Sequence, residues 1–136
     1  EKDYQQLLII KRLARDLDIP TKIIGAPTIR EIDGLAVSSR NVYLSPTHRE
    51  TASSIFKVLK TTATAIALGD DASFASQKAL DDLVLAGFSK IEYFEARHSE
   101  TLELITDTGN PGRLFAAVWL GSTRLIDNLE IKAYSD

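Results

Sequence analysis

The chain has 136 residues, of which 44% are hydrophobic and 26% charged, a composition typical of one compact globular domain. A formal net charge of −3 argues against a nucleic-acid-binding surface, and no stretch reaches the roughly 18 to 20 consecutive apolar residues of a membrane span. The absence of cysteine excludes a disulfide framework and a thiolate metal site, and it suits the cytoplasm. The chain also contains no methionine, so we expect it to be a piece of a longer polypeptide.

A helix is predicted at the start of the chain, over residues 3–18. Its apolar residues recur at helical spacing on one face, which consists of Leu7, Ile10, Ala14 and Leu17. Pro20 ends this helix, and residues 21–24 have the apolar character of a short strand. A helix that enters a short strand is typical of the end of an α/β unit, so we expect a parallel sheet upstream of Glu1.

Residues 26–45 lose this periodicity and are predicted to form a long loop, with one short strand near residues 42–44. Loops of this length in compact domains usually have a function. A helix is predicted to begin at Ser45-Pro46, a hydroxyl N-cap followed by proline, and to continue to about Leu68. A second helix is predicted over residues 72–86, with Phe74, Leu80, Leu83 and Val84 as its core residues, and a glycine follows each of the two helices.

The rest of the chain is rich in strand signals. Residues 90–97 alternate, residues 114–120 form a continuous apolar run with Trp119 in the core, and residues 128–133 are a candidate third strand. Asn110-Pro111-Gly112 marks a turn between the first two strands. This order of elements predicts an α+β fold in which helices pack on a three-stranded antiparallel sheet.

Two segments carry polar groups that could bind a ligand. In the first, Lys2 and Asp3 stand at a helix start, where unpaired backbone N–H groups and the helix dipole attract anions. Gln6 lies one turn further on the same side, and its amide can both donate and accept hydrogen bonds, which suits a hydroxy acid. By composition alone, an exposed helix start with ordinary charges is the simpler interpretation.

The second segment lies in the long loop and contains Ser38, Ser39 and Arg40. Two hydroxyls, several backbone N–H groups and a guanidinium within four residues can surround a triphosphate. Gly34 would give the loop the freedom to close over a ligand. Taken alone, the segment is also compatible with a solvated serine-rich turn. The two histidines show no metal-ligand spacing, and no protein metal site is predicted.

Taken together and in order, these segments resemble the pantothenate synthetase family. The resemblance covers essentially the whole chain and rests on the motifs EKDYQQ, IIGAPTIREIDGLAVSSRNVYLS and GRLFAAVWLGSTRLIDN. The Ser-Ser-Arg-Asn motif with its leader is similar to the KMSKS loop of class I aminoacyl-tRNA synthetases. The resemblance implies that residues 1–26 are the C-terminal tail of a Rossmann-like nucleotide-binding domain. Residues 27–136 would then be a small C-terminal lid domain.

The resemblance also implies roles for particular residues. The implied ATP-binding residues are Glu1, Lys2, Asp3, Ile29, Val37, Ser38, Ser39 and Arg40. The four of these that would act in catalysis are Lys2, Ser38, Ser39 and Arg40. Gln6 matches the pantoate-binding glutamine of the family. The family's first ATP-binding segment, which contains two histidines, would lie upstream of Glu1. We therefore expect no ligase activity from the chain alone.

The reaction implied by the resemblance has two steps. Pantoate attacks the α-phosphorus of ATP, with Mg²⁺ on the phosphates, and gives pantoyl adenylate and pyrophosphate. The amine of β-alanine then attacks the adenylate and releases pantothenate and AMP. The implied partners are these small molecules and a missing N-terminal domain of the same polypeptide, in a homodimeric cytoplasmic enzyme.

Two alternative functions stay open. One is the lid domain of another nucleotidyltransferase-superfamily enzyme that acts on a different acid. Gln6 in EKDYQQ argues against this alternative, because the wider superfamily does not share it. The other is a non-catalytic interaction module, which would bind no nucleotide.

Overall fold

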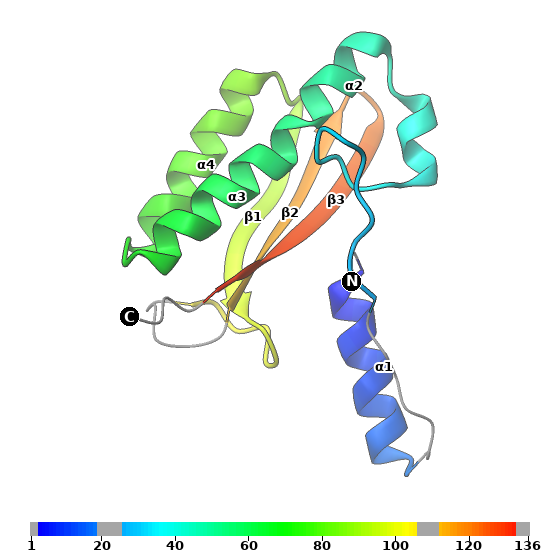
Figure 1. The fold of residues 1–136 in the computed structure, drawn as a ribbon, viewed down its shortest axis with the longest axis vertical. Helices are drawn as coiled ribbons and strands as arrows, with labels where there is room; N and C mark the ends of the chain where they lie inside the picture. Colours follow the sequence, from blue (N-terminus) through cyan, green and yellow to red (C-terminus); the bar gives the residue numbers. More distant parts are fainter. Residues whose placement is uncertain (1–2, 19–25, 106–111, 133–136) are drawn as a thin grey trace.

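The computed structural model describes residues 3–18, 26–105 and 112–132. Its elements in chain order are α1 (Tyr4–Asp16), the 3-10 helix η1 (Ser39–Tyr43), α2 (Pro46–Ala52), α3 (Ser54–Ala67), α4 (Ala72–Ala86), β1 (Lys90–His98), β2 (Gly112–Leu120) and β3 (Thr123–Ile131). The strands form one antiparallel sheet in the order β1-β2-β3, and α3 and α4 cover one face of it (Figure 1). The predicted sheet with helices is confirmed. Within the described residues, no helix is long and apolar enough to cross a membrane.

The main core lies between this helical layer and the sheet. Helical spacing brings Ile55, Leu59 and Ile66 of α3 to one face, where each is at most 2% exposed. Alternate residues of β2 meet them, and Leu114 and Val118 are fully buried. This packing of an apolar helix face on an apolar sheet face is the principal source of stability in the fold.

The helix predicted from Ser45 to Leu68 is interrupted at Ser53, which ends α2 and precedes α3. The predicted start is confirmed, because the hydroxyl of Ser45 accepts a hydrogen bond from the backbone N–H of His48, and Pro46 is the first helical residue. At the interruption, the buried hydroxyl of Ser53 donates to the carbonyl of Glu50 at 2.8 Å. Such local side-chain bonds compete with the backbone hydrogen bonds of a helix interior.

The short strand predicted at residues 42–44 is wrong, because this segment belongs to the end of η1. The hydroxyl of Ser38 accepts a hydrogen bond from the N–H of Arg40, and the N–H of Asn41 donates to the carbonyl of Ser38. These local bonds tighten the chain into a 3-10 turn.

The predicted third strand begins earlier than expected, at Thr123, and pairs with β2 along its whole length. Asp127 and Asn128 have the composition of a turn, but both are buried on the strand, where Arg30 and Arg113 bind their side chains. Trp119 is also placed differently from the prediction. It is half-buried on the face of the sheet opposite the main core, and its indole N–H donates to Glu92.

Helix α4 has the predicted bounds, and Gly87 ends it with a positive φ of 112°. Its buried face differs from the predicted one. It consists mainly of small residues, namely Ala72, Ala75, Ala79 and Leu83. Phe74 and Val84, which were expected in the core, are 68% and 61% exposed. Small side chains allow packed elements to approach closely, and the alanines of α4 belong to the same core cluster as the buried residues of α3.

Helix α1 stands apart from the helical layer and meets the opposite face of the sheet with its first turn (Figure 1). The hydroxyl of Tyr4 donates to the carbonyl of Ser99 at 2.8 Å, and its ring lies 6.0 Å from that of Phe115. The guanidinium of Arg113 stacks over the Tyr4 ring at 4.1 Å. The strand predicted at residues 21–24 and the turn residues Asn110-Pro111 lie outside the described residues.

Candidate functional site

A small hairpin in the long loop forms one side of the candidate site. The N–H of Val37 donates to the carbonyl of Ile29, and that of Glu31 donates to the carbonyl of Leu35. Gly34 closes the turn with a φ of +95°, and a Cβ at this position would collide with the ring of Phe56. Glycine is therefore required here for a left-handed turn packed against α3. This structural role differs from the loop-closing freedom predicted from the sequence.

Arg30 fixes this hairpin to the edge of the sheet. Its guanidinium donates to both carboxylate oxygens of Asp127, at 2.5 and 2.9 Å, and also to the carbonyls of Gly34 and Asn128. The same group stacks over the ring of Phe56 at 4.3 Å. The side chains of Arg30 and Asp127 are 17% and 3% exposed, so the carboxylate is buried and both of its oxygens are hydrogen-bonded to the guanidinium.

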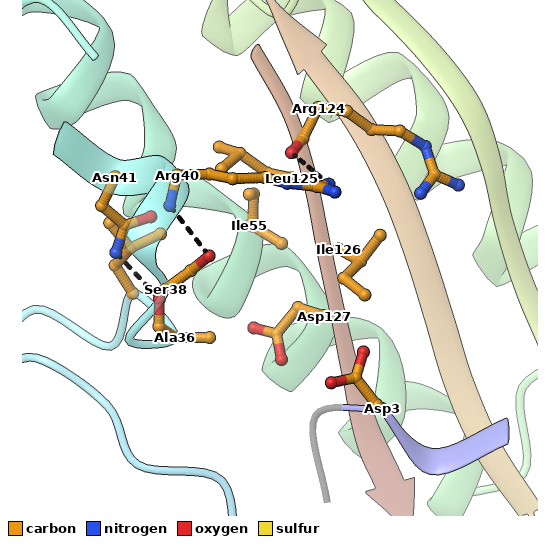
Figure 2. A pocket seen from close by; sticks show the side chains of 11 residues that line it. Asp3, Ala36, Ser38, Arg40, Asn41, Ile55, Arg124, Leu125, Ile126 and Asp127 are labelled. Carbon is orange, nitrogen blue, oxygen red and sulfur yellow. Dashed lines mark hydrogen bonds between the residues drawn. The ribbon is translucent and has the colours of Figure 1, made fainter. Parts of the chain in front are cut away.

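A pocket of about 360 Å³ lies between this loop, β3 and the start of α1. Among the residues predicted to bind ATP, Asp3, Ser38 and Arg40 line it (Figure 2). Figure 2 shows Ser38 and Asp3 on either side of Asp127, with Arg40 extended toward β3. We call this the loop pocket. Its other lining residues are Leu35, Ala36, Asn41, Ile55, Arg124, Leu125, Ile126 and Asp127.

Arg40 is exposed and can reorient toward a ligand. One of its guanidinium nitrogens, Nη1, donates to the carbonyl of Arg124 at 3.4 Å, a long and weak hydrogen bond. Among the described residues, the guanidinium of Arg40 forms no ion pair. The neighbouring Asn41 donates its amide N–H to the carbonyl of Ala36, while its Oδ1 is buried and has no hydrogen-bond partner in the described chain. A bound ligand could supply the missing donor.

The other predicted ATP-binding residues take different positions. Ile29, Val37 and Ser39 are exposed and do not line the loop pocket. The carbonyl of Ile29 and the N–H of Val37 are bonded to each other, at 2.9 Å, so they are engaged in holding the hairpin. Glu1 and Lys2 lie outside the described residues.

Gln6 lines a second, smaller pocket of about 110 Å³, which we call the helix pocket. Gln5, Tyr93 and Phe115 are among its other lining residues. The two pockets share Asp3, Ile126 and Asp127. The residues predicted to bind two different substrates are thus placed around one common wall, which is the middle of β3 and the first residue before α1.

Two further ion pairs lie on the sheet and on the hairpin, and one of them includes Arg124, which lines the loop pocket. Hydrogen bonds from Arg124 and from the indole of Trp119 hold the pKa of Glu92 at about 2, below its usual 4.5. The hydrogen bond to Glu92 in turn raises the pKa of Arg124. On the hairpin, hydrogen bonds from Arg49 lower the pKa of Asp33. These pairs fix strand and loop side chains around the pocket.

Within the described residues, no group of three or more His, Asp or Glu side chains is placed to hold a metal ion. Sequence reasoning missed Arg30, Arg124 and Asp127, although all three stand in the motifs that carry the family resemblance. The available signal was an aspartate directly before the predicted third strand, because a carboxylate that becomes buried requires a partner. The partner, 97 residues away, could not be identified from spacing.

The family model described as pantoate-beta-alanine ligase matches residues 1–130. The pantothenate synthetase of Rhodopseudomonas palustris (strain BisA53) is 52% identical over 132 residues, which are 96% of this chain and 46% of that protein. That of Roseobacter denitrificans (strain ATCC 33942 / OCh 114) is 47% identical over 131 residues, again 96% and 46%. The chain belongs to the pantoate–β-alanine ligase family, and it spans about half the length of these curated relatives, which are called pantothenate synthetases.

Solved structures give the same assignment. A pantothenate synthetase from Thermus thermophilus superposes with a TM-score of 0.90 at 40% identity, over 96% of this chain and 48% of that one. A pantoate-beta-alanine ligase from Francisella tularensis, complexed with beta-gamma ATP and beta-alanine, superposes with a TM-score of 0.69 at 33% identity. The match covers 98% of this chain and 42% of that one. The resemblance to the C-terminal portion of this family is thereby confirmed.

Proposed function

We propose that this chain forms the part of a pantoate–β-alanine ligase that binds the phosphates of ATP and one side of pantoate. The observation that carries the proposal is the common wall of the loop pocket and the helix pocket. Asp3, Ser38 and Arg40 line one, Gln6 lines the other, and both include Asp127. A reaction between a nucleotide and a small acid requires two adjoining sites of this kind. The ATP and β-alanine named for the Francisella structure support the same substrates.

The loop pocket would act on the triphosphate. The exposed guanidinium of Arg40 is held by one long hydrogen bond, so it can turn its planar fork to phosphate oxygens. The hydroxyl of Ser38, which lines the pocket, would add a donor on the same side, and Ser39, which does not line it, keeps only the role that the resemblance implies. Lys2, which lies outside the described residues, would contribute a second cation, as the resemblance implies. Charge that develops on departing pyrophosphate is then stabilised mainly in the transition state.

The chemistry needs no covalent nucleophile from this chain. A carboxylate oxygen of pantoate attacks the α-phosphorus of ATP, and the bond to the bridging oxygen breaks with its electron pair leaving on pyrophosphate. The amine of β-alanine then attacks the acyl carbon, the acyl–oxygen bond breaks, and AMP departs as the new amide loses a proton. Mg²⁺ would enter as part of the nucleotide substrate. The residues of the chain supply position and charge.

The test of Arg40 is the single-turnover release of pyrophosphate by the complete ligase, with saturating ATP and pantoate. Arg40→Ala is expected to lower this rate by at least ~100-fold, comparable to the loss of one preorganised transition-state donor. Arg40→Lys should recover part of the rate, because it keeps the charge and loses the fork. An unchanged rate, with the defect confined to the β-alanine step, would remove Arg40 from this role.

The test of Gln6 separates the two substrates. Gln6→Ala should raise the KM for pantoate about tenfold, as expected when one hydrogen-bond partner is removed from a desolvated site. The KM for ATP should change much less. Gln77→Ala, at an exposed position of α4 that lines neither pocket, is the matched variant and should leave both KM values unchanged. Equal changes in the KM values for ATP and pantoate would contradict the assignment. Because the chain spans about half the length of its relatives, we expect no pantothenate formation from these 136 residues alone.

A further inference from the structure

The buried carboxylate of Asp127 presents a problem for any triphosphate in the loop pocket. It lies in the wall of the pocket, 3% exposed, at the place where the loop pocket and the helix pocket meet. An uncompensated carboxylate in a weakly solvated wall repels phosphate strongly, because screening by water is weak there. The pocket therefore needs a cation assigned to this carboxylate.

Arg30 is that cation, and its position is fixed by more than the charge pair. Two hydrogen bonds to Asp127, bonds to the carbonyls of Gly34 and Asn128, and the contact with the ring of Phe56 hold the guanidinium in place. Arg30 itself does not line the loop pocket. It therefore acts on a ligand through Asp127.

The other charged side chains of the loop pocket show how the Arg30–Asp127 ion pair changes its balance of charge. Four charged side chains line the loop pocket, namely Asp3, Arg40, Arg124 and Asp127. Arg124 is already paired with Glu92, which leaves Arg40 as the one lining guanidinium without an acidic partner in the described part of the chain. With Arg30 absent, the two carboxylates would outnumber this guanidinium. With Arg30 present, the charge of Asp127 is cancelled and Arg40 can attract phosphate.

We propose that Arg30 is a positioning residue for ATP, which makes the shared wall acceptable to a triphosphate by cancelling the charge of Asp127. This inference rests on the proposed function, since it assigns ATP to the loop pocket. It goes further by identifying a residue outside both pockets that controls the affinity for one substrate. Pantoate, which is bound from the helix pocket side by Gln6, should depend on the pair much less.

The test is a cycle of Arg30→Gln, Asp127→Asn and the double variant in the complete ligase, with KM measured for ATP, pantoate and β-alanine. Arg30→Gln should raise the KM for ATP at least about tenfold, equivalent to about 1.4 kcal/mol of binding. The double variant should restore it to within about threefold of the parent, because the repelling charge is gone. If the role of Arg30 is purely structural, the opposite is expected: the KM for ATP of the double variant is no lower than that of Arg30→Gln.

Arg30→Lys covers the case in which Arg30→Gln does not fold. Its ammonium keeps a charge beside Asp127 and loses the fork, so the KM for ATP should stay within about threefold even if the melting temperature falls. Arg97→Gln is the matched control, since Arg97 forms a similar ion pair with Glu95 on β1 and neither residue lines either pocket. It should leave all three KM values unchanged.

The possible outcomes distinguish a failure of the inference on Arg30 from a failure of the proposed function. The inference alone is overturned if the parent is active and the KM for ATP of the double variant, or of Arg30→Lys, is raised by tenfold or more. The same holds if the KM values for ATP and pantoate rise in parallel. A parent that forms no pantothenate from ATP, pantoate and β-alanine overturns the proposed function and the inference together.

Discussion

Helices α1 and α3 have similar lengths and similar apolar faces, but these faces are buried to different extents. Helix α3 buries five residues against α4 and the sheet, whereas α1 buries Ala14 alone among its described side chains. Ile9 and Leu13 of α1 and its C-cap residue Leu17 are between 54% and 65% exposed. An amphipathic pattern therefore predicts that a face exists and does not predict what covers it.

The two helices are also held by different forces. Helix α3 is held by burial of apolar area, which is distributed over the whole helix. Helix α1 is held near its first turn by the hydrogen bond and ring contacts of Tyr4, and further along by a bond from Arg12 to the carbonyl of Glu100. The effects of substitutions on stability should therefore differ between the two helices, both in size and in the region that is affected.

The largest expected difference is between Leu59→Ala and Leu13→Ala. Leu59 is fully buried on α3, so its truncation should lower the free energy of unfolding by about 2–5 kcal/mol. Leu13 is 54% exposed on α1, and its truncation should cost less than about 0.5 kcal/mol. Denaturant unfolding of the chain, followed by circular dichroism, measures both. Equal losses would mean that the apolar face of α1 is covered in solution.

A substitution at Gly34 tests whether the hairpin of the long loop is held by packing on α3. Gly34→Ala should cost about 2–4 kcal/mol, because the new Cβ adds a collision with Phe56 to the strain of a positive φ. Gly69→Ala has the matching strain, with φ at +109°, and nothing within 4 Å of the new Cβ. It should cost about 1–2 kcal/mol. If the two losses measured by thermal unfolding are equal, the hairpin is not packed on α3.

A smaller effect is expected at the contact between α1 and the sheet. Tyr4→Phe removes the hydrogen bond to Ser99 and keeps the ring, at a cost of about 0.5–1.5 kcal/mol. Hydrogen exchange should become faster in the amides of α1 and stay unchanged in those of α3. Arg12→Gln, at an exposed and longer contact, should have less effect. Faster exchange in both helices to the same extent would show that they unfold as one unit.

The smallest effect concerns an exposed ion pair and appears through pH. Since the folded-state pKa of Glu92 is lowered to about 2 from its usual 4.5, its contribution to stability is present above pH 4.5. It is lost as the pH falls toward about 2. The stability difference between the parent and Glu92→Gln should therefore shrink over this range, as should that for Arg124→Gln. A difference that stays constant as the pH falls would exclude the lowered pKa.

The parts of the fold that follow local rules could be predicted from the sequence. The bounds of α4, the cap at Ser45 and the antiparallel sheet depend on neighbouring residues and on periodicity, which the sequence displays directly. The interruption at Ser53 could not be predicted, since serine is also common inside helices and its bond to Glu50 depends on the local geometry.

The candidate site likewise contains residues that could be predicted from the sequence and residues that could not. Asp3, Ser38 and Arg40 could be named from motif chemistry, and the structure brings them to one pocket. The wall of that pocket could not be named, because Asp127 is recognisable only together with Arg30, and their pairing depends on the completed fold. The sequence placed the start of the third strand at residue 128, so Asp127 was left outside it, whereas β3 begins at Thr123.

The two-residue turn between β2 and β3 has a consequence for engineering this protein. Leu120 pairs with Thr123, so Gly121 and Ser122 alone connect the strands. One residue inserted here would shift the register of β3 and turn Asp127 to the opposite face of the sheet, away from Arg30. An insertion at Gly69, where the surrounding space is open, should leave the sheet intact. Loop grafting is therefore feasible at the α3–α4 connection, while the hairpin must keep its length.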